Sequence, residues 1–191
     1  NSYIRAIRWA SDRIGNAGVI GFVTNAGFMN AISADGLRRC LAEEFSSIYV
    51  FHLRGNQRTS GELSRREGGK VFGGGSRAPI AISLLIKNPD AKHSGQIKFL
   101  DIGDYLSRDE KLAKIAQFGS VSGIYAADSW RIITPDSHGD WLKQRDTNFD
   151  RHIALGDKKG QQLRLFETFS NGVKSNRDAW VFNGSKRELR A

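Results

Sequence analysis

The stretch RGNQRTSGELSRREGGKVFGGGSRAPIAISLLIK, residues 54–87, decides the fold. Its first 24 residues hold seven glycines and six Lys or Arg against two Glu. Such a segment buries too little apolar surface to offset its ordering entropy, so it predicts a mobile, cationic surface loop. The loop passes without a linker into residues 78–86, an apolar run of strand length. A basic loop anchored on a buried strand is a common way to present functional residues on a rigid scaffold.

Composition points to an anionic partner. The chain of 191 residues has a formal net charge of +9, and its apolar share of 39% is sufficient for a packed core. Nucleic acid is the first candidate, because Lys and Arg that neutralise phosphates supply most non-specific affinity. The alternative is that the protein is basic without a functional reason.

Cysteine usage and hydropathy exclude several classes. A single cysteine, Cys40, rules out an internal disulfide and a Cys-rich metal site, and we expect it to pack as a small hydrophobe in a helix. No apolar run reaches the length of a membrane span and no signal peptide is visible, so we expect a cytoplasmic protein without a membrane partner. The chain starts inside a predicted helix without an initiator Met, and we therefore expect it to be part of a longer protein.

Upstream of the loop, the pattern alternates helix and strand. A helical apolar rhythm from Tyr3 to Ile14 is followed by residues 19–23, which predict a buried central strand. Ser33 is a plausible N-cap for a helix over residues 34–44, and residues 47–53 predict a second strand. That helix is expected to bury three apolar side chains, Leu37, Cys40 and Leu41.

Downstream of the loop, residues 96–102 predict a strand and residues 108–117 a helix. Beyond Gly119 the periodicity weakens, which favours loops and short elements over an independent core. Three of the four tryptophans, Trp9, Trp130 and Trp141, are interpreted as packing residues. The fold class is α/β: a partial Rossmann-like sheet in which the two strands that flank the long loop pair antiparallel, followed by an irregular tail.

Most catalytic motifs fail. Lys70 is followed by Val71, so the loop is not a phosphate-binding P-loop. The glycines at 73–75 precede a strand, whereas a dinucleotide fingerprint follows one. Four isolated histidines show no metal-ligand spacing, so no metal is expected. An acidic pattern around Asp90 loosely echoes restriction-type nucleases, but Asn-Pro-Asp is an ordinary turn.

The order of several short motifs resembles a known family. NSYIRAIRWASDRIGNAGVIGFVTNAGF, SIYVFHL and KVF followed by APIAISLLIK are similar to the middle and end of γ-type N6-adenine DNA methyltransferases. The phrases HLRGNQRTSG, GDWLKQRD and FSNGVKSNRDAWVF make the resemblance closest to the methyltransferase part of type ISP, single-chain restriction-modification enzymes. It spans roughly residues 1–183.

The resemblance implies only half of a catalytic domain. In this family a Gly-rich turn holds S-adenosylmethionine, and a D/N/S-P-P-Y/F tetrapeptide orients the adenine amino group. The chain has three prolines, none adjacent, so the tetrapeptide is absent and no catalytic residue is assigned. Residues 1–118 are then the C-terminal half of the methyltransferase domain, and 119–191 an irregular segment leading to target recognition. We expect the isolated chain to be inactive and to bind no S-adenosylmethionine, because the missing N-terminal half supplies that cofactor's site.

The same resemblance implies roles in binding double-stranded DNA. These enzymes flip the adenine out of the duplex and stack it on an aromatic side chain. The matching position is Phe72, and the alternative is that Phe72 merely caps the sheet edge. Phosphate contacts are expected from the loop cations Arg54, Arg58, Arg65, Arg66, Lys70 and Arg77, whose alternative is a solvated basic loop.

Lys174, Asn176 and Arg177 are expected to line the DNA or adenine side of the cleft, or else to form a polar network that holds their segment to the sheet. A second functional class also stays open, namely a non-enzymatic, basic nucleic-acid-binding α/β module. Such a module would bind DNA without depending on Phe72.

Overall fold

The computed structural model describes residues 2–74, 76–146, 148, 151–170 and 172. Contacts divide the chain into two units, the first ending at Arg145 and the second beginning at Asp146. The described part of the second unit consists of turns and one parallel bridge between Ala154 and Arg164. None of the helices in the described residues is long and apolar enough to cross a membrane.

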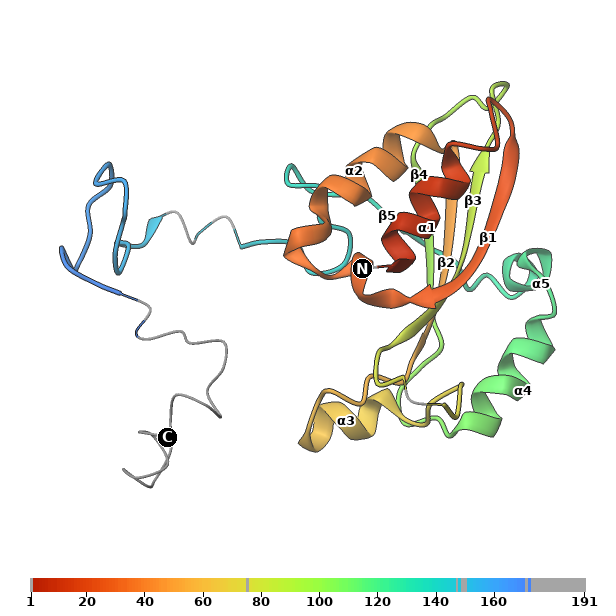
Figure 1. Ribbon diagram of the computed structural model, residues 1–191. Helices are drawn as coiled ribbons and strands as arrows, with labels where there is room; N and C mark the ends of the chain where they lie inside the picture. Colours follow the sequence, from red (N-terminus) through yellow and green to blue (C-terminus); the bar gives the residue numbers. More distant parts are fainter. Residues whose placement is uncertain (1, 75, 147, 149–150, 171, 173–191) are drawn as a thin grey trace, which may run out of the picture. The chain divides into compact units, whose positions relative to one another are not determined.

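The first unit is a five-stranded mixed sheet with helices on both faces (Figure 1). The strands lie in the order β1-β3-β2-β4-β5; β3 is antiparallel to β1 and β2, β2 and β4 are parallel, and β5 is antiparallel to β4. Their bounds are β1 Gly18–Asn25, β2 Ser47–Arg54, β3 Ile80–Lys87, β4 Gln96–Asp101 and β5 Arg131–Ile133. The helices are α1 Ser2–Ser11, η1 Ala26–Met29, η2 Ile32–Ala34, α2 Asp35–Glu44, α3 Gly61–Glu67, α4 Arg108–Phe118 and α5 Val121–Ala126.

This architecture confirms the α/β class, including the antiparallel pairing of the strands that flank the long loop. The predicted strand at 47–53 and the predicted helix at 108–117 are also confirmed. The latter helix begins with a capping box, in which Ser107 and Glu110 satisfy each other's backbone N–H groups.

Two apolar clusters fix the helices to the sheet. On one face, α1 and α2 pack through Ile7 and Leu41 against the inward side chains of β1 to β4. On the other face, α4 and α5 pack against Phe51 of β2 and Leu100 of β4. Strand alternation sends neighbouring residues to opposite faces, so each strand contributes to both clusters.

The prediction of a buried central strand at residues 19–23 is wrong. β1 lies at the edge of the sheet, and the side chains of Val19 and Val23 are 61% and 53% exposed. An all-apolar run is typical of a strand buried on both faces, but here only the face with Ile20 is covered by α1. The uncovered valines leave an apolar strip and an unpaired strand edge.

The burial predicted for α2 is also wrong in part. Cys40 is exposed, Leu37 is half-buried, and the buried positions are Arg38 and Leu41. The helix starts one residue late, with Ala34 and not Ser33 at its N-cap, because the 3-10 turn η2 precedes it. Hydropathy could not find Arg38 in the core, because its burial depends on partners that come from far away in the sequence.

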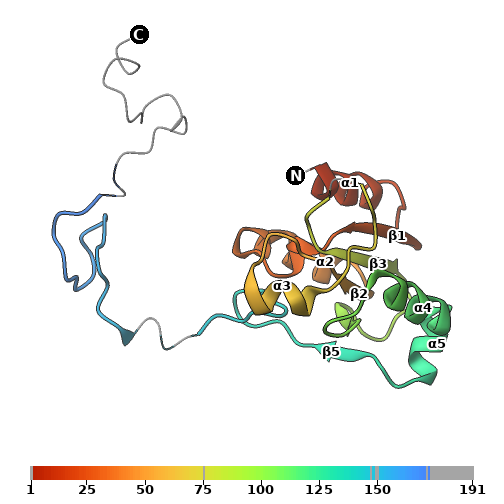
Figure 2. The same cartoon turned by 90° about the horizontal axis from the view of Figure 1, so that it is seen from below.

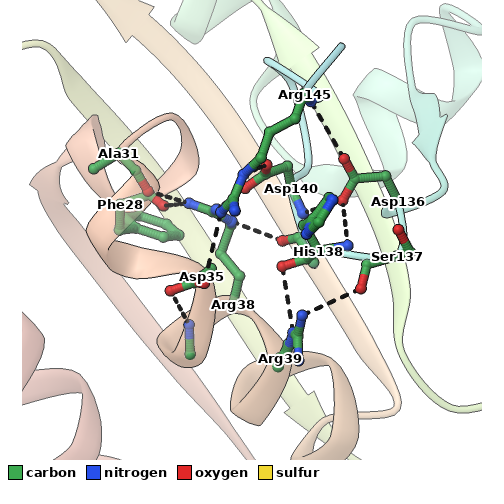
Figure 3. A network of polar contacts seen from close by, with 12 residues as sticks. Phe28, Ala31, Asp35, Arg38, Arg39, Asp136, Ser137, His138, Asp140 and Arg145 are labelled. Carbon is green, nitrogen blue, oxygen red and sulfur yellow. Dashed lines mark hydrogen bonds and ion pairs between the residues drawn. The ribbon is translucent and has the colours of Figure 1, made fainter. Parts of the chain in front are cut away.

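The buried Arg38 donates to four hydrogen-bond acceptors (Figure 3). Its guanidinium donates to the carbonyl oxygens of Phe28 at 2.8 Å, Ala31 at 2.7 Å and Gly139 at 2.8 Å, and forms an ion pair with Asp140. Asp140 also accepts from Arg145 Nε at 2.8 Å. Residues 139–145 are thereby fastened to η1 and α2.

The segment after Gly119 is more ordered than its weak periodicity predicts. It contributes α5, β5 and the buried Trp141, which packs edge-to-face on Phe28 with ring centroids 6.1 Å apart. The prediction that Trp141 is a packing residue is confirmed. Trp9 is 60% exposed and stacks under the Arg13 guanidinium at 3.9 Å, so the same prediction is wrong for Trp9.

Candidate nucleic-acid interface

The carboxyl ends of β1, β2 and β4 lie at one edge of the sheet, because all three strands run in the same direction. Figure 2 views the molecule from this side, with α3 in front of the strands. The chain leaves β2 toward β3 and leaves β4 toward β5, in opposite directions across the sheet. In open α/β sheets such divergence creates a crevice in which ligands bind.

The loop between β2 and β3 is anchored at this edge and contains the short helix α3. Gly69 N–H donates to the Leu106 carbonyl at 2.9 Å, and Gln57 N–H donates to the Arg77 carbonyl at 2.9 Å. The buried Lys111 Nζ donates to the carbonyl oxygens of Glu67 and Gly69, both at 2.8 Å, and its burial lowers its pKa. The cationic surface loop predicted at residues 54–77 thus contains one short helix, at residues 61–67.

Phe72 lies at the surface, directly after the buried residue Val71. Val71 is 7% exposed and packs in the α4/α5 cluster, whereas the ring of Phe72 is 51% exposed. The ring borders an open pocket of about 1110 Å³, including the part open to solvent, which Arg58 and Arg77 also line. The end of β1 forms the opposite wall, where the Thr24 hydroxyl is buried and has no hydrogen-bond partner among the described residues. An exposed ring beside two cations has the composition of a site for a nucleobase with its phosphate.

The six predicted loop cations fall into two groups. Arg58, Lys70 and Arg77 lie around Phe72, and the structure shows no ion pair for them within the described part of the chain. The other three are engaged with carboxylates: Arg65 with Glu62 at 2.6 Å, Arg66 with Asp104 at 2.7 Å, and Arg54 with Asp101 at 2.6 Å as well as with Asp104. Phosphate contacts by the second group would compete with these ion pairs. Lys174, Asn176 and Arg177 lie outside the described residues.

Asp101, at the carboxyl end of β4, organises the neighbouring polar cluster. Its carboxylate accepts from Arg54 Nε at 2.6 Å and Gly103 N–H at 2.8 Å, and its Oδ2 lies 3.3 Å from His52 Nδ1. Burial alone would raise the pKa of Asp101, but the hydrogen bonds from His52 and Arg54 outweigh it, and the pKa lies far below the usual 3.8. His52 is 8% exposed, and its Nε2 has no partner among the described residues.

We expect Asp101→Asn to lower the free energy of unfolding by about 1–3 kcal/mol at pH 7, because a charge-assisted acceptor is replaced by a neutral amide. A carboxyl whose folded-state pKa is depressed stabilises the protein fully above pH 3.8, and this contribution disappears as the pH falls toward the folded-state pKa. Urea unfolding of both proteins at pH 7 and near pH 2 should therefore show a difference that shrinks in acid. An equal difference at both pH values would contradict the ion-pair role.

A second hollow opens beside this cluster, on the face that carries α1 and α2. It is bordered by Asn30 after η1, by Arg131 of β5 and by Lys143. None of the three was predicted as a site residue: Asn30 and Arg131 lie outside the quoted motifs, and Lys143 lies in GDWLKQRD, which carried only the resemblance. The carboxylate of Asp101 had a detectable signal: it lies near the end of the strand predicted at residues 96–102 and two residues before a glycine.

Comparisons with known proteins were made for the whole chain. No family model matches it, and no curated protein matches it. Solved structures do match in both fold and sequence. A nuclease-deletion mutant of the type ISP restriction-modification enzyme LlaGI, in complex with a DNA substrate mimic, is 46% identical with a TM-score of 0.86. The ATP-dependent type ISP restriction-modification enzyme LlaBIII bound to DNA is 43% identical with a TM-score of 0.90, and the DrdV–DNA complex is 30% identical with a TM-score of 0.82.

These matches cover 98–99% of this chain but only 12–19% of the other chains. The chain is thus similar to one segment of much larger, DNA-bound enzymes, two of which are type ISP restriction-modification proteins. This agrees with the type ISP part of the resemblance found in the sequence.

Proposed function

We propose that this chain is the DNA-binding and target-base half of an adenine-N6 DNA methyltransferase within a restriction-modification protein. The observation that carries the proposal is the exposed Phe72 ring beside cations that form no ion pair among the described residues, on a chain 43–46% identical to segments of DNA-bound type ISP enzymes. In this proposal Phe72 stacks on the flipped adenine, while Arg58, Lys70 and Arg77 contact the adjacent phosphates.

The unpaired edge of β1 is where the missing half would join. Val19 and Val23 are exposed there, and a strand added to this edge would satisfy its backbone groups and cover the apolar strip. The Gly-rich turn for S-adenosylmethionine would belong to that other half, and so would the catalytic tetrapeptide, since this chain contains no adjacent prolines. Its residues would supply binding and orientation of DNA and would not carry the methyl donor.

The test is base flipping by the complete protein, read from the fluorescence of 2-aminopurine placed at candidate adenine positions of a duplex. We expect the wild-type protein to raise the fluorescence by unstacking the probe, and Phe72→Ala to change that signal. Stacking on an aromatic ring is worth about 1–3 kcal/mol per base, so the flipped state should be about 5- to 150-fold less populated in the variant.

Two variants control this experiment. Phe72→Trp keeps an aromatic face and should retain flipping, whereas Leu63→Ala removes another exposed apolar side chain of the same loop and should change little. Binding without a fluorescence change, unaffected by Phe72→Ala, would reject the methyltransferase role and leave a basic DNA-binding module.

A further inference from the structure

The second hollow at the carboxyl edge shares no lining residue with the Phe72 pocket, and its lining carries a net positive charge. It measures about 1210 Å³, including the part open to solvent, and its walls come from β2, α3, β4, β5 and the segment after Trp141. Four cations line it, Arg54, Arg66, Arg131 and Lys143, against the two carboxylates of Glu67 and Asp101. An excess of positive charge in a concave surface attracts anions.

Two of these cations are already neutralised. Arg54 is paired with Asp101 and Asp104, and Arg66 is paired with Asp104. Arg131 and Lys143 are exposed, and neither has an ion pair within the part of the chain that the structure describes. These two residues therefore determine which ligand the hollow attracts.

The Arg131 side chain rests on a buried ring, and the backbone of Lys143 belongs to an anchored segment. The Arg131 guanidinium lies 5.3 Å from the ring centroid of Phe99, a core residue that is 6% exposed. A guanidinium resting on an aromatic face keeps its N–H donors in a fixed plane, which suits a tetrahedral phosphate. Lys143 follows the buried Trp141 in the segment that the Arg38–Asp140 ion pair fastens to α2. The preorganised Arg131 guanidinium therefore loses little entropy when an anion binds.

We propose that this hollow is a second phosphate-binding site, in which Arg131 and Lys143 contact a backbone phosphodiester of the DNA whose base meets Phe72. The inference rests on the proposed function and adds a contact surface on the opposite side of the β2–β3 loop. Two separated phosphate contacts would fix the orientation of the duplex over the sheet edge, a role that sequence-independent contacts usually perform.

The test is the salt dependence of DNA binding by the complete protein. Each phosphate contact contributes about 0.9 to the slope of log K against log salt on duplex DNA. We expect Arg131→Gln and Lys143→Gln each to lower the slope by about 0.9, and the double variant by about twice that. Lys92→Gln is the matched control, because Lys92 is an exposed cation in the turn at the opposite edge of the sheet. Slopes for the Arg131 and Lys143 variants equal to that of Lys92→Gln would overturn the proposal.

Free nucleotide is the other source of the same phosphate chemistry. Titration with dAMP should give binding that is weak and independent of Arg131 and Lys143, whereas tight dAMP binding that depends on both, with an unchanged DNA slope, would refute a backbone site. The fluorescence of 2-aminopurine separates this inference from the proposed function. At saturating DNA the double variant should still flip the base, and a wild-type protein that never flips would reject only the methyltransferase role.

Discussion

Replacing Asp140 by Asn is expected to lower the free energy of unfolding by about 3–5 kcal/mol. The Arg38 guanidinium is 1% exposed and Asp140 is its only carboxylate partner among the described residues. An amide in place of the carboxylate leaves a buried cation without a counter-charge, and desolvation of that charge is then uncompensated. The loss should appear in urea unfolding monitored by circular dichroism, and the near-ultraviolet signal of Trp141 should weaken first.

The control for this prediction is Asp12→Asn. Asp12 also pairs with an arginine, Arg8, but the two side chains are 49% and 57% exposed. Solvent screens such a pair, so the unfolding curve of Asp12→Asn should stay close to that of the wild-type protein. Equal losses in the two variants would show that burial does not determine the importance of the Arg38–Asp140 pair.

Replacing Gly68 by Ala is expected to destabilise the protein by about 3 kcal/mol and to displace the loop that carries Phe72. Gly68 ends α3 with φ 67° and ψ −158°, a backbone conformation that is essentially restricted to glycine. A Cβ at this position would also collide with the backbone carbonyl of Leu106. Urea unfolding measures the decrease in the free energy of unfolding. The 2-aminopurine signal should also decrease, because the loop that carries Phe72 can no longer pack against the backbone of residues 106–108.

Gly73→Ala offers a matched control one residue after Phe72. A Cβ at Gly73 would meet no heavy atom within 4 Å, so this substitution adds the same methyl group without a collision. We expect Gly73→Ala to leave stability unchanged and to retain base flipping. Loss of flipping in Gly73→Ala, with normal stability, would mean that the loop must adopt a different conformation on DNA.

The sequence by itself determined the alternation of helix and strand, the antiparallel pairing around the basic loop, and the similarity to type ISP enzymes. Each of these depends on local information: hydrophobic periodicity, turn residues, or the order of short motifs along the chain. The sequence also placed Phe72 in a basic, glycine-rich surface loop, and the residue is 51% exposed.

Only the tertiary structure decided which apolar strand is an edge, which polar residues are buried and which cations are free. The burial of Val19 and Arg38 differs from the expectation because burial depends on what covers a residue: the outer face of Val19 is exposed, and the acceptors of Arg38 include Gly139, which is distant in sequence. Arg54 and Arg131 are both arginines that the sequence alone does not distinguish. In the structure Arg54 is neutralised by two carboxylates, whereas Arg131 lines an open hollow. Ion pairing is a short-range interaction between segments that the sheet brings together. The sequence therefore gives the net positive charge of this protein, but it does not show which cations remain available to DNA.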